Sequence, residues 1–96
     1  MEAVVLSYRQ LRGDRSLMLT MYSTTWCGYC RRLATGLDRA GIRYAQVNIE
    51  LDDEAAQLVM NINGGNRTVP TVMFPDGTAL TNPTVAEISA RLASAA

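Results

Sequence analysis

The sequence contains no histidine and no lysine, and only two of its 96 residues are cysteines. A structural zinc site needs four ligands, usually cysteine and histidine, so a single copy of this chain would have to complete the set with carboxylates, which is uncommon. A dimer that shares two cysteine pairs is the remaining way to build such a site. We therefore expect no metal site within one chain.

An excess of charge of one sign and a long apolar run are also missing. Nine arginines balance nine acidic residues, so the chain has no net charge to attract nucleic acid or an anionic membrane surface. No apolar run approaches the length of a membrane span, and "MEAVVLSYRQLRGDR" lacks the basic start and the longer apolar stretch of a secretory signal. We expect a cytoplasmic monomer without nucleic-acid or membrane partners.

Length and composition predict one folded domain. At 96 residues, of which 48% are hydrophobic, the chain can form a single modest core. The stretch "RQLRGDRS" near the amino terminus is polar, so residues 1–17 are expected to form a flexible extension. Residues 18–96 are expected to form the domain itself.

Apolar periodicity and turn residues predict an alternation of strands and helices after residue 16. Leu33, Leu37 and Ala40 recur at helical spacing, and Gly41 after them is a C-cap signal. The expected elements are a strand over 17–23, a helix over 28–40, a strand over 42–49, a helix capped by Asp52 or Asp53, a hairpin with strands over 71–74 and 78–81, and a last helix. The last helix begins either with Asn82 as its cap or with a capping box of Thr84 and Glu87. This order predicts an α/β fold that starts with a parallel strand–helix–strand unit.

Both cysteines stand in "TTWCGYCRRL", residues 24–33, where the first strand gives way to the helix. The N–H groups at a helix start lack partners and the helix dipole is positive there, so a thiolate at Cys27 is favoured. Cys30, one turn further into the helix, is expected to be less exposed and protonated. A disulfide across so short a loop would stabilise the fold little. In a reducing compartment this pattern favours redox chemistry, with Cys27 attacking and Cys30 resolving, over a structural bridge or a shared metal.

The stretches "YSTTWCGYC", "RTVPTVMF" and "DGTALTNPT" resemble the glutaredoxin-like family of the thioredoxin fold, and within it the mycoredoxins, which use mycothiol in place of glutathione. The resemblance runs from about residue 18 to the carboxyl terminus. It implies a thioredoxin-like (glutaredoxin-type) three-layer α/β/α sandwich with a four-stranded mixed sheet and about three helices. It also implies no bound cofactor, mycothiol as the reducing co-substrate, and mycothiolated client proteins as partners.

The resemblance assigns Val69 and Pro70 to the same site as the cysteines. Pro70 matches the family's cis-proline, which implies a cis Val69–Pro70 bond that faces Cys27 and Cys30. Such a bond would let the main chain of Val69 pair with an extended substrate. An ordinary trans proline at the start of a strand is the alternative.

Three aromatic residues and one arginine complete the implied site. Tyr29, between the cysteines, is expected to flank the incoming thiol, and Tyr22 to pack beside it. Trp26 either forms a wall of the cleft or packs partly buried. Arg67 lies in the loop that the family uses to bind its low-molecular-weight thiol, where it either attracts an anionic group or is a solvated loop residue.

The segment "LTNPT", residues 80–84, departs from the usual glutaredoxin pattern. Glutathione-dependent members typically carry two glycines and an acidic residue before the last helix, and both features are missing here. The implied activity is therefore reduction of mycothiol–protein mixed disulfides. The alternatives are a redoxin reduced directly by thioredoxin reductase, although the "WSGF"-type stretch usual in those proteins is absent, and a non-catalytic thioredoxin-like binding module.

Overall fold

The computed structural model describes residues 18–95, so the extension expected over residues 1–17 lies outside the described residues. The elements are β1 (Leu19–Ser23), α2 (Gly28–Ala40), β2 (Tyr44–Asn48), α3 (Asp53–Ile62), β3 (Thr71–Met73), β4 (Ala79–Thr81) and α4 (Val85–Ala95). This is the predicted order, and the strands are shorter than the apolar runs that predicted them. Within residues 18–95, no helix combines the length and the apolarity that crossing a membrane requires.

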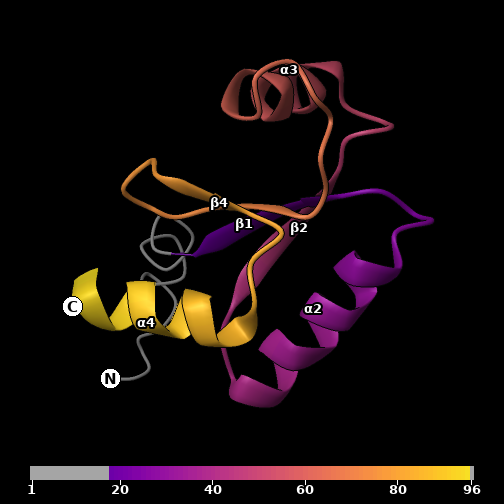
Figure 1. Cartoon of the computed structure of the whole chain (residues 1–96). Coiled ribbons are helices and arrows are strands. Elements are labelled where there is room, and N and C mark those ends of the chain that lie inside the picture. Colours follow the sequence, from indigo (N-terminus) through magenta and orange to yellow (C-terminus); the bar gives the residue numbers. More distant parts are fainter. Residues whose placement is uncertain (1–17, 96) are drawn as a thin grey trace, which may run out of the picture.

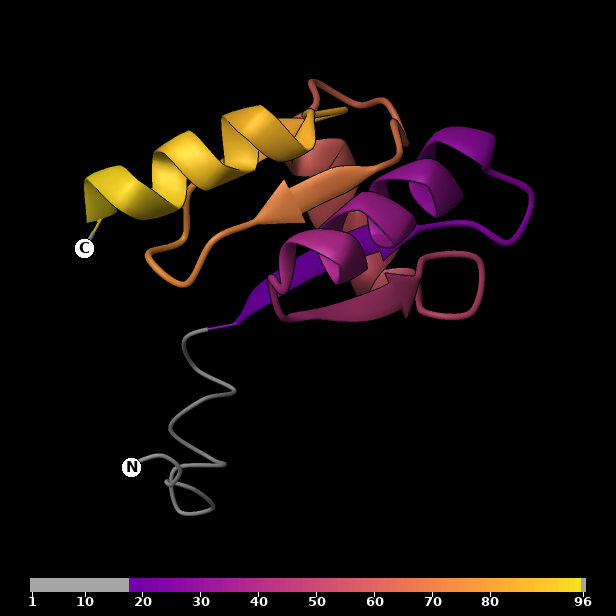
Figure 2. The ribbon, with the colours of Figure 1, turned by 90° about the horizontal axis from the view of Figure 1, so that it is seen from below.

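The four strands form one mixed sheet in the order β2-β1-β3-β4. β1 and β2 are parallel, as the crossover through α2 requires, whereas β3 pairs antiparallel with both β1 and β4. α3 covers one face of the sheet, and α2 and α4 cover the other (Figure 1). Figure 2 shows α2 and α4 side by side on their shared face. The predicted three-layer sandwich is therefore confirmed.

Alternation along β1 supplies a core on each side of the sheet. Leu19 and Met21 join the cluster under α2 and α4, and Tyr22 joins the cluster under α3. The first cluster consists of Leu19, Met21, Leu33, Leu37, Val72, Phe74 and Ile88, and the second of Tyr22, Ile49, Ala55, Ala56 and Val59. Ala40, which helical spacing places with Leu33 and Leu37, is exposed instead, and it is the last residue of α2.

The helix ends follow the local signals in the sequence. Gly41 adopts the left-handed conformation at φ 71° and ends α2, as predicted. Of the two candidates for the cap of α3, Asp52 is the cap, and its carboxylate accepts from the Ala55 N–H at 3.0 Å. α4 begins with the predicted capping box: the Glu87 N–H donates to the Thr84 hydroxyl at 3.1 Å, and the Thr84 N–H donates to the Glu87 carboxylate at 2.8 Å.

α2 and α4 pack closely at a glycine inside α2. A Cβ atom added at Gly36 would lie 2.7 Å from Val85 Cγ2, a separation that two carbon atoms do not tolerate. The missing side chain at position 36 therefore lets the first turn of α4 pack directly on α2. This contact holds the first turn of α4 close to α2 at Gly36.

Candidate active site

Cys27 is the N-cap residue of α2. The chain leaves β1 at Ser23, turns through residues 24–26 and reaches Cys27 in an extended conformation with φ −82° and ψ 109°. The Cys30 N–H donates to the Cys27 sulfur at 3.1 Å, which is the contact that a serine or aspartate oxygen usually accepts at this position. A free helix N–H aimed at a sulfur stabilises negative charge on that sulfur.

Cys30 lies one turn further along and is 1% exposed. Burial, followed by the hydrogen bond with Cys27, raises the pKa of the Cys30 thiol to about 12. At neutral pH this thiol therefore keeps its proton, as the sequence predicts. Both cysteines are free, so the two sulfurs form an unequal pair of thiols.

Cys27 is more enclosed than a reactive thiol at the start of a helix would suggest. It is only 4% exposed, so its exposed fraction is barely larger than that of Cys30. The cap geometry turns its sulfur inward, where it lies 3.9 Å from the Val69 carbonyl oxygen. The neighbours Trp26 and Tyr29 point outward instead and are 69% and 61% exposed, so the alternative of a partly buried Trp26 is wrong.

The predicted cis bond between Val69 and Pro70 is present, so the alternative of a trans proline is wrong. Pro70 is buried, and its carbonyl accepts from the Asn82 N–H at 2.7 Å. Asn82 itself has a positive φ of 50°, which turns the chain from β4 toward α4. The Val69 carbonyl that faces Cys27 is thus held by a loop attached to the segment before α4.

Asn63 anchors the other end of that loop, a role that no local pattern in the sequence predicts. Its side-chain amide donates to the Val59 carbonyl at 2.9 Å and to the Thr71 hydroxyl at 3.1 Å. Its amide oxygen accepts from the Thr81 hydroxyl at 2.6 Å. An asparagine after a helix predicts a loop. Its hydrogen bonds to β3 and β4 could not be predicted, because they depend on how the strands pack.

A groove runs along the side of α2 that carries Tyr29. It has a volume of about 370 Å³ and lies between the first turns of α2 and the segment that leads into α4. Its lining residues are Tyr29, Arg32, Leu33, Asn82, Pro83, Thr84 and Val85. The Arg32 guanidinium lies 5.3 Å from the centre of the Tyr29 ring, so the two exposed side chains stack at the mouth of the groove.

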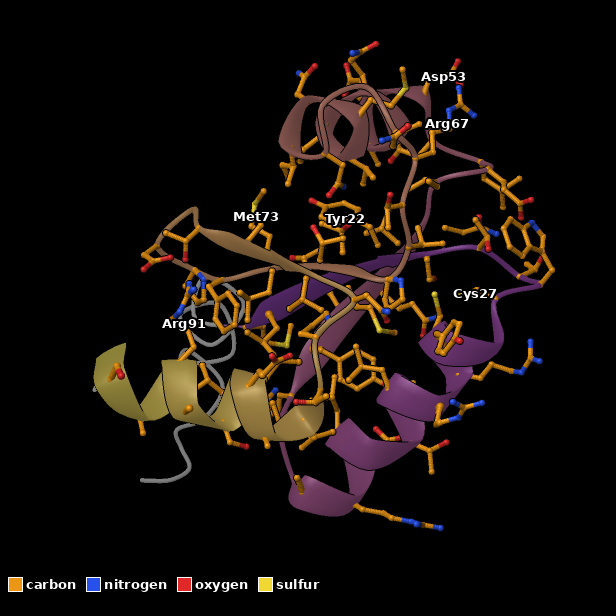
Figure 3. All side chains as sticks on the ribbon, in the orientation of Figure 1. Tyr22, Cys27, Asp53, Arg67, Met73 and Arg91 are labelled. Atoms are coloured by element: carbon orange, nitrogen blue, oxygen red, sulfur yellow. The ribbon has the colours of Figure 1, made fainter. Side chains whose placement is uncertain are left out.

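Tyr22 and Arg67 lie elsewhere. Tyr22, expected beside the incoming thiol, is buried in the cluster between the sheet and α3, because alternation along β1 directs it to that face. Arg67 is exposed in the loop after α3, and Figure 3 shows it near Asp53 at the α3 side of the molecule, apart from Cys27. A role for Arg67 therefore requires a ligand that extends from the sulfur toward α3.

Glu50 is a second residue that sequence reasoning missed. Its carboxylate, just after β2, accepts hydrogen bonds from the Thr25 and Trp26 residues that precede Cys27. No local signal marks an acidic residue after a strand as part of a distant site. Among residues 18–95 no three cysteine, aspartate or glutamate side chains gather into a potential metal cluster.

The comparisons with known proteins agree with this geometry. Residues 19–79 match the family model described as Glutaredoxin. A glutaredoxin homologue of Mycobacterium tuberculosis is 55% identical over 74 residues, which cover 77% of this chain and 88% of that protein. Mycoredoxin 1 of Corynebacterium glutamicum is 47% identical over 74 residues, which cover 77% of this chain and 91% of that protein.

Solved structures show the same fold. The glutaredoxin from Methanosarcina mazei Go1 superposes with a TM-score of 0.68 over 80% of this chain and 79% of that chain, at 22% identity. The family match, the related sequences and the paired thiols at the start of α2 all point to one chemistry. The chain belongs to the glutaredoxin family and is a thiol–disulfide oxidoreductase.

Proposed function

We propose that this glutaredoxin reduces mixed disulfides between mycothiol and client proteins, with Cys27 as the attacking sulfur. The observation that carries the proposal is the placement of that sulfur, which accepts from the Cys30 N–H at 3.1 Å and faces the Val69 carbonyl at 3.9 Å. The name of the relative Mycoredoxin 1 supports mycothiol as the thiol. So does the segment 80–84, which lacks the glycine pair and the acid typical of glutathione-dependent members.

The reaction is two thiol–disulfide exchanges in sequence. The Cys27 thiolate attacks the mycothiol sulfur of the mixed disulfide, that disulfide breaks, and the client sulfur leaves as a thiolate and takes up a proton. The thiolate of a second mycothiol then attacks the mycothiol sulfur now bonded to Cys27. This step releases mycothiol disulfide and restores the Cys27 thiolate, so the two electrons come from mycothiol. No bound metal or prosthetic group takes part.

A second route uses Cys30. Its thiol loses a proton and attacks Cys27, which releases mycothiol and leaves a disulfide between the two cysteines for later reduction. The raised pKa of Cys30 makes this route slow at neutral pH, because the attacking thiolate is scarce. The structure therefore favours the route that needs Cys27 alone.

The remaining site residues receive roles by position. We assign the main chain at Val69 and Pro70 to the extended part of the substrate, because this carbonyl faces Cys27. The groove beside Tyr29 is large enough for part of a mycothiol molecule, and Trp26 is exposed next to the sulfur in the chain. Arg67 is assigned to a part of the substrate that reaches toward α3.

We propose a monomer as the active unit. Two free cysteines and a reductant such as mycothiol fit a reducing compartment, so we place the protein in the cytoplasm. Mycothiol and mycothiolated proteins are the proposed partners.

The test compares turnover of one cysteine-containing peptide in two forms, mycothiolated and glutathionylated, each with its own thiol as the reductant. We expect clear preference for the mycothiol pair, no turnover with Cys27→Ser, and retained turnover with Cys30→Ser. Equal rates with the glutathione pair would overturn the mycothiol assignment. Efficient reduction by thioredoxin reductase without mycothiol would support the redoxin alternative instead.

A further inference from the structure

Trp26 is exposed, yet its ring is held in place by a hydrogen bond. The indole Nε1–H donates to Glu50 Oε2 at 2.8 Å, although 69% of the residue is open to solvent. The other carboxylate oxygen of Glu50 accepts from the Thr25 N–H at 3.3 Å and from the Thr25 hydroxyl at 3.1 Å. One carboxylate therefore binds two consecutive residues immediately before Cys27.

The turn that carries Thr25 and Trp26 is also held from the other side. Arg31 Nη1 donates to the Thr25 carbonyl at 3.3 Å. Because β1 ends at Ser23, both main-chain groups of Thr25 lie outside the sheet and are bound by side chains instead. Glu50 differs from Arg31 in that it holds the turn from outside the cysteine loop and α2.

The pairing of β1 with β2 brings Glu50 to this turn. The two strands are parallel and Ser23 is aligned with Asn48, so the residues two positions further along each strand, Thr25 and Glu50, come out beside each other. The Glu50 N–H donates to the Asn48 side chain at 2.8 Å, which fixes the bend after β2. The hydrogen bond from Trp26, followed by those from Thr25, lowers the pKa of Glu50, so the carboxylate stays charged at neutral pH.

The contact of Glu50 with Thr25 and Trp26 contributes little to the stability of the fold. Glu50, Thr25 and Trp26 are all exposed, and exposed polar contacts contribute little to the free energy of unfolding. What the contact does determine is the direction of a large apolar side chain one residue away from Cys27. Leu51, the residue after Glu50, is itself 85% exposed, so the same loop carries a second uncovered apolar side chain.

We propose that Glu50 is a positioning residue that fixes the Trp26 indole beside Cys27 as an ordered apolar surface for the polypeptide part of the disulfide substrate. The proposal rests on the proposed function, in that it takes a protein disulfide as the substrate. A client segment that meets an already ordered ring loses less side-chain entropy on binding than one that must immobilise it. A small disulfide without a polypeptide part gains nothing from this surface.

The test compares Glu50→Ala and Glu50→Gln with Glu54→Ala, which removes an equal charge from an exposed position in α3 that has no hydrogen bond to the turn. Trp26 is the single tryptophan of the chain, so time-resolved fluorescence anisotropy reports on this ring alone. The kinetic assay uses a mycothiolated peptide and, in parallel, bis(2-hydroxyethyl) disulfide. Circular dichroism melting verifies that each variant is folded.

We expect Glu50→Ala to increase the fast local motion of Trp26 and to raise KM for the peptide about three- to tenfold, which is the range for immobilising one free side chain. The small disulfide should react at the wild-type rate, and Glu54→Ala should behave as wild type. Glu50→Gln should be intermediate, because the amide keeps one acceptor oxygen for either Thr25 or Trp26.

Unchanged anisotropy in Glu50→Ala would overturn the proposal, and so would an equal loss of rate with both substrates, which indicates a general structural effect. Absence of peptide turnover by the wild-type protein would refute the proposed function instead. In that case the anisotropy comparison would still decide whether Glu50 holds the ring.

Discussion

Replacing Gly36 by alanine tests the packing that places α4 against the cysteine-bearing helix. The added Cβ would lie 2.7 Å from Val85 Cγ2, well inside normal carbon–carbon contact. Val85 is β-branched and sits in the first turn of α4, so its methyl group has little freedom to rotate away. The two helices must therefore separate slightly, or Val85 must adopt a poor rotamer.

Two opposing effects determine the magnitude. Overpacking typically costs about 1–3 kcal/mol, whereas exchanging glycine for alanine within a helix gains about 1 kcal/mol. Gly36→Ala should therefore lower the free energy of unfolding by about 0–2 kcal/mol. Val85→Ala alone shortens a half-buried side chain and should cost about 1 kcal/mol.

The double variant isolates the clash. Val85 Cβ lies 4.0 Å from the Cβ position at residue 36, so two alanines would make an ordinary contact there. The pair should be more stable than the sum of the single changes by about 1–3 kcal/mol. Urea denaturation followed by far-ultraviolet circular dichroism is the suitable assay, because the exposed Trp26 is a poor reporter of unfolding. The reasoning would be refuted if Gly36→Ala stabilised the protein by the full helix-propensity gain and the two single changes in the free energy of unfolding were additive.

Three other predictions concern the thiols, the start of α4 and the Pro70 loop. Burial is the largest cause of the raised pKa of Cys30, and it persists after Cys27 has reacted. The attack of Cys30 on a Cys27–thionitrobenzoate disulfide should therefore accelerate about tenfold per pH unit between about pH 7 and 9. A rate that does not change with pH in stopped-flow absorbance would contradict this. Thr84→Ala removes the hydroxyl that caps the Glu87 N–H and should cost about 1 kcal/mol in urea denaturation, whereas Thr84→Ser should be close to wild type. Asn63→Ala deletes three hydrogen bonds and should cost about 2 kcal/mol in the same assay, and a loss within error would show that the loop does not depend on them.

Features encoded within a few residues could be predicted from the sequence. The capping box of Thr84 and Glu87 and the left-handed Gly41 are local, so the residues that specify them are neighbours in the chain. The places of the two cysteines, Cys27 before the helix and Cys30 in its first turn, could be predicted in the same way because they lie only three residues apart. The cis bond before Pro70 and the three-layer arrangement needed the family resemblance in addition.

Features that depend on chain segments meeting in space could not be predicted. The small volume at Gly36 is required by Val85, which is 49 positions away, and the carboxylate of Glu50 reaches Trp26 only because β1 and β2 pair in one particular register. The low exposure of Cys27 likewise depends on the Val69 carbonyl, which approaches from a distant loop. Periodicity and capping signals carry no information about such encounters.

The three hydrogen bonds of the Asn63 side chain fix the point at which the loop after α3 begins. One amide holds the end of α3, the start of β3 and the end of β4 together, and the buried Pro70 closes the far end of the excursion. The exposed residues between these two fixed points, Gly64 to Arg67, can therefore diverge among related proteins without disturbing the reactive sulfur. Substitutions, or even a change of length, within this short stretch should leave the position of the Cys27 sulfur unaltered.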